Sequence, residues 1–204
     1  MQMKILVTTW FDKACEYDGY FLDRNRYFCK EQGVDFIHSS ERTLQDLRPH
    51  WERIPLVKKH LPNYDYVLWV DGDAHVTGKP LVELVGQNHL LIGKDIDREP
   101  DLHRVNSGVF LLKNTPWSFK LLDEWLKLGP RASLKYKRHE RTLGKRYRFQ
   151  DQGALRWMFL NDLLDIKSNA TVLPYGDLQH FSQKTSYVVH YAGPRGKRRL
   201  NRLL

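Results

Sequence analysis

Two carboxylates separated by one residue follow an apolar segment near the middle of the chain. The segment is Tyr66 to Val70, and Asp71-Gly72-Asp73 comes directly after it. In an α/β sheet, ligands bind at the carboxyl ends of the strands. Two carboxylates beside a glycine can reach one hard cation that also holds phosphate oxygens. The pattern therefore predicts a site for a divalent cation and a phosphate group, with an acidic Asp-Gly turn as the alternative.

A phosphatase of the haloacid dehalogenase type also places D-x-D after an apolar strand. That motif requires Thr or Val two residues after the second aspartate, where this chain has His75. Its strand is also the first of the chain, whereas here it is the third. Both differences argue against a phosphatase.

The positive charge of the chain lies in two segments. The formal net charge is +9, from 33 Lys and Arg against 24 Asp and Glu. Residues 131–148 carry +7 and residues 195–202 carry +5, so the rest sums to −3. Such clusters suit a polyanion, and a basic nucleic-acid-binding protein with an incidental D-x-D turn is one interpretation. We find no RRM, KH or zinc-finger pattern, so we favour a phosphate-bearing substrate and expect no nucleic-acid partner.

The elements that must position these residues alternate along the chain. Apolar, β-branched runs predict strands, and helical spacing with caps predicts helices. The expected strands are 4–10, 34–38, 64–70, 89–93, 108–112 and 187–191, and the expected helices are 20–32, 50–60, 80–85, 116–128 and 151–161. We expect a basic loop at 131–148 and a basic tail after 193. This order predicts an α/β fold in a single domain, 1–204.

Three absences bear on location. No apolar run approaches the roughly 20 residues that cross a bilayer, so we expect no membrane span. The chain begins without the pattern of a signal peptide. Only Cys15 and Cys29 are present, which gives no disulfide framework and favours a reducing compartment. We therefore expect a cytoplasmic protein, in the host cytoplasm if the chain is viral.

Four segments, in order, resemble the donor-site core of the GT-A glycosyltransferases of family 8, with family 34 as a near neighbour. They are Arg53–Pro62 with Tyr66–Val76, Asn106–Leu112, Asp151–Leu155 and His190–Pro194. The resemblance covers roughly residues 50 to 197. It implies a GT-A, Rossmann-like nucleotide-diphospho-sugar transferase fold, with a mixed central sheet flanked by helices.

The resemblance also implies a metal centre. Asp71 and Asp73 would hold Mn²⁺ or Mg²⁺ against the diphosphate of a nucleotide sugar, with His190 as the third protein ligand. Manganese accepts mixed oxygen and imidazole ligands, so the chemistry is consistent.

Further residues match the donor and catalytic positions of the family. Asp151 and Gln152 would face the reacting bond and the acceptor. The residues implied in binding the nucleotide sugar are Thr8, Thr9, Arg53, Asp71, Gly72, Asn106, Ser107, Gly193 and Lys197. The terminal segment departs from the family's His-x-x-Gly-x-x-Lys-Pro-Trp, because the lysine comes one residue late and Pro-Trp is missing. Lys197 is our choice for the diphosphate, with Arg195 as its substitute.

The implied activity is transfer of a hexose or deoxyhexose from a UDP-sugar to a hydroxyl of a glycan or glycoprotein. We expect the acceptor to bind against the loop at residues 131–148. The alternative is that this loop is a mobile lid, since Gly129 and Gly144 flank most of it. The resemblance implies retention at the anomeric carbon, through Asp151 or Gln152 or by front-face attack. Inversion would need a carboxylate base, for which Asp95, Asp97 or Asp151 could serve. The sequence does not choose between these routes.

Overall fold

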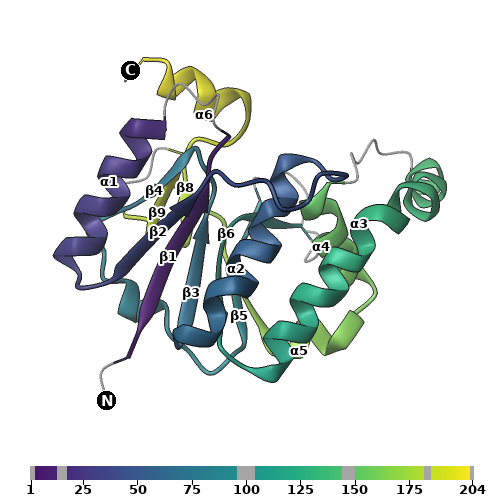
Figure 1. Ribbon diagram of the computed structural model, residues 1–204. Helices are drawn as coiled ribbons and strands as arrows, with labels where there is room; N and C mark the ends of the chain where they lie inside the picture. Colours follow the sequence, from purple (N-terminus) through teal and green to yellow (C-terminus); the bar gives the residue numbers. More distant parts are fainter. Residues whose placement is uncertain (1–2, 13–17, 96–103, 144–149, 182–184, 203–204) are drawn as a thin grey trace.

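A six-stranded mixed sheet forms the centre of the fold, in the order β2-β1-β3-β6-β5-β7 (Figure 1). The computed structural model describes residues 3–12, 18–95, 104–143, 150–181 and 185–202. The strands are β1 (Ile5–Trp10), β2 (Asp35–Ser39), β3 (Tyr66–Val70), β5 (Leu90–Lys94), β6 (Val105–Lys113) and β7 (Ala170–Leu173). β1 pairs in parallel with both β2 and β3, and β6 runs antiparallel to β3 and β5. The expected α/β fold with a mixed sheet flanked by helices is confirmed.

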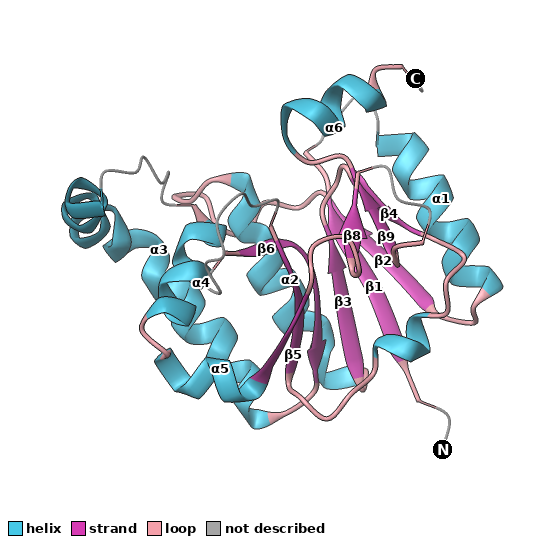
Figure 2. Cartoon of the chain, turned by 180° about the vertical axis from the view of Figure 1, so that it is seen from behind, coloured by secondary structure: helices cyan, strands magenta, loops and turns pink. Residues whose placement is uncertain are grey.

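Three helices pack on one face of this sheet (Figure 2). They are α2 (Arg53–His60), α3 (Pro116–Leu143) and α4 (Asp151–Leu160). Neighbouring residues of a strand point to opposite faces, so Val67 and Trp69 of β3 join the apolar cluster under these helices. Short helical segments connect the main elements: η1 (Pro49–Glu52), η2 (Leu61–Asn63), η3 (Leu81–Leu84), η4 (Leu163–Asp165) and α5 (Ile166–Asn169).

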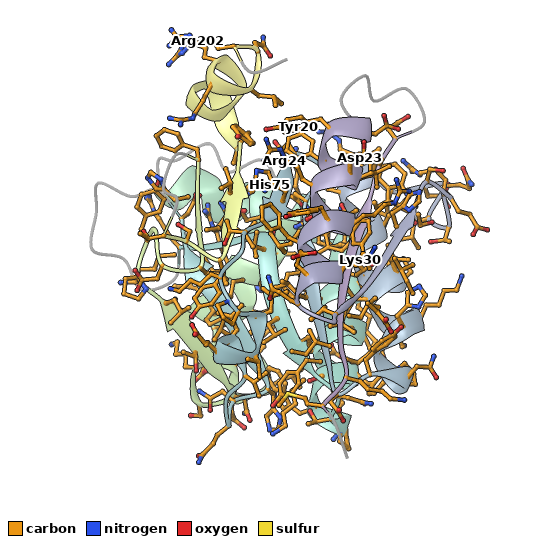
Figure 3. All side chains as sticks on the ribbon, turned by 90° about the vertical axis from the view of Figure 1, so that its left-hand side faces the viewer. Tyr20, Asp23, Arg24, Lys30, His75 and Arg202 are labelled. Carbon is orange, nitrogen blue, oxygen red and sulfur yellow. The ribbon has the colours of Figure 1, made fainter. Side chains whose placement is uncertain are left out.

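Helix α1 and a small second sheet cover the other face. Tyr66, Leu68 and Val70 of β3 point to this side. The covering elements are α1 (Asp18–Glu31) and the strands β4 (Ala74–Val76), β9 (Val188–His190) and β8 (Gln179–His180), in the order β4-β9-β8. Figure 3 shows His75 behind α1, close to Tyr20. The His75 side chain is buried, and burial lowers its pKa, so it is a core residue.

Helix α3 corrects the sequence-based interpretation. Gly129-Pro130 was expected to end it at residue 128, but the helix continues to Leu143 and its far end projects beyond the sheet (Figures 1 and 2). A Cβ on Gly129 would lie 3.2 Å from Leu47 Cδ1 and 3.4 Å from the Trp51 ring. This glycine therefore permits a close approach of α3 to η1 instead of ending a helix. The expected basic loop is helical over 131–143; the side chains of that stretch, and residues 144–149 altogether, lie outside what the structure describes.

The basic segment after the last strand is also a helix and not an extended tail. It forms α6 (Gly193–Leu200), which lies beside the start of α1 (Figure 1). Leu200 is buried against Phe21 and Tyr191, whereas Arg198 and Arg199 are exposed. The helix is amphipathic, which is why a segment rich in cations can still pack on the domain.

The described part of the chain contains no helix that is both long and apolar enough to cross a bilayer.

Candidate metal and donor site

The candidate site lies where the direction of chain connection reverses. β1 lies between β2 and β3 in the sheet, so the connections diverge at the carboxyl ends of β1 and β3. Ligands of open α/β sheets bind at such a switch point. Thr8 and Thr9 lie at this end of β1, and Asp71 comes directly after β3.

Three candidate ligands converge at this edge. Nε2 of His190 lies 3.2 Å from Oδ1 of Asp73 and 3.8 Å from Oδ2 of Asp71. The ligand atoms of all three residues lie within 4.8 Å of one another. Adjacent ligands of an octahedral ion at about 2.1 Å are about 3 Å apart, and opposite ones about 4.2 Å. The two distances from Nε2 of His190 fall in this range, so these three residues, the Asp-Asp-His triad, could hold a single Mn²⁺ or Mg²⁺ ion.

Register in the small sheet brings these ligands together. β4 begins immediately after Asp73, and β9 pairs with it antiparallel, so that Ala74 lies opposite His190. The backbone N–H of Tyr191 donates to the carbonyl oxygen of Asp73 at 2.9 Å. A ligand from residue 190 is thus held beside ligands from residues 71 and 73 by backbone hydrogen bonds.

Gly108 of β6 forms the floor of the triad. A Cβ at this position would lie 2.2 Å from Cε1 of His190 and 2.8 Å from Oδ2 of Asp71. The backbone there is fixed, because Asp71 N–H donates to the Gly108 carbonyl oxygen at 2.8 Å and Gly108 N–H donates to Asn106 Oδ1 at 2.8 Å. Only glycine leaves room for the ring and the carboxylate together.

The two carboxylate oxygens of Asp71 face different neighbours. Oδ1 of Asp71 accepts a hydrogen bond from Trp69 Nε1 at 2.9 Å and pairs with Arg53 Nη2 at 3.0 Å, which leaves Oδ2 facing His190. Burial raises the pKa of Asp71, although Arg53 and His190 oppose that shift. A bound cation would favour the ionised form.

His190 is buried, at 5% exposure. Burial lowers its pKa, but the carboxylates of Asp73 and Asp71 outweigh burial, so the pKa is raised overall. A cation between the three ligands would replace the proton on the ring.

Arg53 connects Asp71 of the triad to Asp151 at the start of α4. The side chain is 5% exposed, and its guanidinium pairs with Asp71 and, through Nε at 3.1 Å, with Oδ2 of Asp151. Nη1 also donates to the hydroxyl oxygen of Ser107 at 2.9 Å and to the carbonyl oxygen of the same residue. The guanidinium is thus occupied by protein groups in this structure.

Asp151 and Gln152, at the start of α4, both contact Ser107. The Ser107 hydroxyl donates to Oδ2 of Asp151 at 3.0 Å, and the Ser107 N–H donates to Oε1 of Gln152 at 3.1 Å. Asp151 is buried and Gln152 is partly exposed. The neighbouring Asn106 donates to Asp95, which also pairs with Arg156 of α4.

Thr8, Thr9, Gly72 and Gly193 are the remaining predicted residues that the structure describes in full. Thr8 and Thr9 are fully buried, and their hydroxyls have no hydrogen-bond partner in the part of the chain that the structure describes. Gly72 closely approaches Trp10 of β1, because a Cβ there would lie 3.2 Å from the carbonyl oxygen. Gly193 begins α6 with a φ of 67°. The backbones of Arg195 and Lys197 lie in α6, but their side chains are outside the description, as is the whole of Asp97.

Sequence reasoning did not single out Gln179. This buried residue of β8 contacts Nδ1 of His190 through Oε1 at 2.6 Å. Its contact with the site depends on the pairing of two very short strands, for which the local sequence carries no signal.

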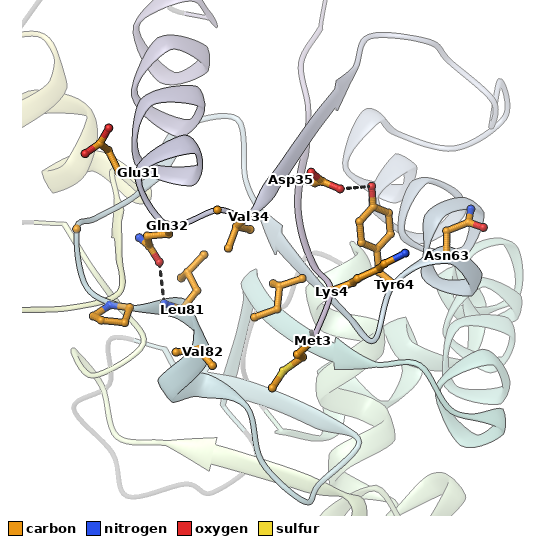
Figure 4. A pocket seen from close by; sticks show the side chains of 14 residues that line it. Met3, Lys4, Glu31, Gln32, Val34, Asp35, Asn63, Tyr64, Leu81 and Val82 are labelled. Carbon is orange, nitrogen blue, oxygen red and sulfur yellow. Dashed lines mark hydrogen bonds between the residues drawn. The ribbon is translucent and has the colours of Figure 1, made fainter. Parts of the chain in front are cut away.

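A cavity of about 850 Å³ lies at the opposite edge of the sheet, near the amino ends of β1 and β3 (Figure 4). Some of its polar side chains pair within the protein: Tyr64 donates to Asp35 at 2.9 Å, and Gln32 accepts from Leu81 N–H at 2.8 Å. None of the predicted site residues lines it, so we assign the chemistry to the triad.

The sequence is similar to those of known glycosyltransferases. A probable glycosyltransferase 6 of Oryza sativa subsp. indica is 30% identical over 153 residues, which are 68% of this chain and 32% of that protein. Xyloglucan 6-xylosyltransferase 4 of Arabidopsis thaliana is 28% identical over 122 residues, which are 53% of this chain and 23% of that protein. The chain thus spans a third or less of the length of these relatives. No family model matches the chain.

Solved structures define the fold. A glycosyltransferase involved in the glycosylation of the major capsid of PBCV-1 superposes with a TM-score of 0.74 over 98% of both chains, at 14% identity. The galactosyltransferase LgtC, in complex with donor and acceptor sugar analogs, gives 0.54 over 93% of this chain and 87% of its own, at 15% identity. The chain has the GT-A fold and is related in sequence to glycosyltransferases. These relatives give the nucleic-acid-binding alternative no support.

Proposed function

We propose that the chain is a glycosyltransferase that depends on a divalent cation and moves a sugar from a UDP-sugar to a hydroxyl of a glycan or glycoprotein. The observation that carries this proposal is the convergence of Asp71, Asp73 and His190 at the switch point of a GT-A sheet. The relationship to plant glycosyltransferases supports the reaction class. Assignment to family 34, or to family 8, is part of the proposal, and the similarity to a xyloglucan 6-xylosyltransferase favours family 34.

The donor diphosphate would bind beside the triad. When bound, Mn²⁺ or Mg²⁺ would act as a Lewis acid toward the departing diphosphate. Gly108 leaves the space that the triad needs, and Gly72 allows the close approach of its own turn to Trp10. The basic residues of α6, among them Lys197, would offer positive charge to the departing diphosphate. Stabilisation of the charge that develops on a leaving group is often the largest contribution to the rate.

The partners of the carboxylates favour retention. Asp151 is buried and is held by Arg53 and Ser107, and Asp95 is held by Arg156 and Asn106. A general base must reach the proton it removes. Of the candidate bases, the structure describes Asp95 and Asp151, and both are engaged by other protein groups. We therefore propose front-face attack with a phosphate oxygen as base. Asp151 would position Arg53. Gln152, which is partly exposed, would lie beside the reacting sugar.

Calorimetric titration with UDP tests the donor site. Wild type should bind UDP in the micromolar range with Mn²⁺, and binding should be lost in EDTA and in Asp73→Ala. GDP should bind more weakly, because the proposal names a uridine donor. Asp123→Ala is the matched control, since this acid lies on α3 and pairs with Lys58; its UDP affinity should equal that of wild type.

Two outcomes would contradict the proposal. If wild type shows no metal-dependent nucleotide binding, Asp71-Gly72-Asp73 is a turn, and binding to nucleic acid becomes the next hypothesis to test. If Asp73→Ala retains full affinity in Mn²⁺, the triad is not the metal site.

A further inference from the structure

The two ring nitrogens of His190 face different surroundings. Nε2 faces the carboxylates of Asp71 and Asp73. Nδ1 lies 2.6 Å from the amide oxygen of Gln179, and both side chains are buried, at 5% and 4% exposure. A neutral imidazole can coordinate a metal only through the nitrogen that carries no proton.

We propose that Gln179 is a positioning residue of the metal centre, an inference that rests on the proposed function. Its Oε1 accepts the hydrogen bond from Nδ1–H of His190. This bond keeps the proton on Nδ1, leaves the lone pair on Nε2, and fixes the rotation of the ring toward Asp71 and Asp73. Partners of this kind commonly contribute a factor of about 10 to 100 to metal affinity.

The surroundings of Gln179 determine which amide atom faces the ring. Its Nε2 donates toward the carbonyl oxygen of Asn106 at 3.4 Å, so Oε1 is left for His190. An acceptor is what the ring needs on this side, because Nε2 coordinates a cation between the carboxylates only when the proton of the neutral ring is on Nδ1. The reverse amide orientation would bring two donors together at Nδ1.

The backbone holds the pair in place. β8 and β9 run parallel, with Gln179 opposite Val188, and Val188 N–H donates to the Leu178 carbonyl oxygen at 3.0 Å. Gly93 of β5 lies against the amide, since a Cβ there would be 3.6 Å from Nε2 of Gln179. The amide therefore has little freedom to leave the ring.

Gln179→Met tests the proposal, because methionine keeps the approximate length and volume but removes the acceptor. Mn²⁺ alone is the probe, and free Mn²⁺ is followed by electron paramagnetic resonance with and without UDP. We expect an affinity about 10- to 100-fold below wild type. Gln179→Glu, which retains an oxygen at the same reach, should bind Mn²⁺ more tightly than Gln179→Met.

Gln32→Met is the matched control. Gln32 also makes two amide hydrogen bonds, to the Thr77 carbonyl oxygen at 2.9 Å and from Leu81 N–H at 2.8 Å, but it lies near the cavity at the far edge of the sheet (Figure 4). It should lose a similar amount of stability and keep the wild-type Mn²⁺ affinity. If losing an amide with two hydrogen bonds had a general effect, both variants would lose the same Mn²⁺ affinity, and this result would overturn the proposal.

A second measurement needs no metal. In ¹⁵N-histidine-labelled, metal-free protein at alkaline pH, Gln179 favours the Nδ1–H tautomer of His190 and the two carboxylates favour the Nε2–H tautomer. Gln179→Met should therefore increase the Nε2–H fraction. If Gln179→Met does not fold, Gln179→Asn, whose amide is one methylene shorter, replaces it in both experiments.

The outcomes separate the two proposals. Absence of Mn²⁺ binding by wild type would overturn the proposed function. If wild type binds Mn²⁺ and Gln179→Met binds it equally well with an unchanged tautomer, only the role of Gln179 is refuted.

Discussion

Replacing Gly108 by alanine is the smallest change that should disable the metal centre. The added methyl carbon would lie 2.2 Å from Cε1 of His190, whereas ordinary van der Waals contacts begin near 3.4 Å. The strand is fixed by hydrogen bonds on both sides, so the ring has to move by about 1.2 Å. That movement takes Nε2 out of reach of a position shared with Asp71 and Asp73.

Two separate losses follow in Gly108→Ala. Overpacking of this kind destabilises a protein by about 1–3 kcal/mol. Displacing a ligand costs more affinity than losing the group that orients it, so Mn²⁺ affinity should fall by more than about 100-fold, or about 2.7 kcal/mol. The assays are chemical denaturation without metal and calorimetric titration with Mn²⁺ at a temperature where the variant is folded.

Gly78→Ala is the control for the glycine replacement. It lines the cavity at the far edge of the sheet, and its added carbon would meet Phe28 Cε1 at 3.8 Å, an ordinary contact. We expect a small change in stability and unaltered Mn²⁺ affinity. Wild-type Mn²⁺ affinity in folded Gly108→Ala would refute the reasoning, because His190 could not then be held where the structure places it.

Three further predictions concern other parts of the molecule. Arg53→Met removes the cation that pairs with Asp71 and Asp151, and it should lower the free energy of unfolding, measured in urea, by about 3–5 kcal/mol. The control Lys127→Met removes an exposed ion pair and should lower it by less than about 1 kcal/mol. Burial raises the pKa of the Cys29 thiol to about 12, so folded Cys15→Ser should not react with a thiol reagent at pH 8 and should react once unfolded; rapid labelling of the folded variant would contradict that burial. Basic residues of α3 were assigned to the acceptor: Lys135, Lys137 and Arg138. Replacing all three by alanine should raise the acceptor KM and leave UDP affinity, measured by calorimetry, unchanged; unchanged acceptor kinetics would refute the assignment.

The sequence predicted the central part of the fold well because its signals are local. An apolar run followed by Asp71-Gly72-Asp73 identifies a buried strand with polar groups at its carboxyl end, and the structure has β3 there. The placement of His190 beside these aspartates came only from the resemblance, since the pairing of β4 with β9 joins segments more than a hundred residues apart.

The predictions that failed involve contacts that the local sequence does not record. Gly129-Pro130 has the composition of a helix end, but the glycine is needed where α3 meets Trp51. The cations after Gly193 have the composition of a tail, but Leu200 gives them one apolar anchor. Strand β8 consists of two residues, Gln179–His180, which is too short to leave a period in the sequence.

In the small sheet β4-β9-β8, the register of the strands determines whether the candidate metal ligands lie together. His190 lies opposite Ala74, and its neighbour Val189 points to the other face. A slip of β9 by one residue would therefore place valine where the imidazole belongs and would separate Gln179 from the ring. If the proposed cation binds only the correct register, it stabilises that register over every slipped pairing by RT ln(1 + [cation]/Kd). Binding of the ion would thus favour the native pairing of β4 with β9 during folding, before any substrate binds.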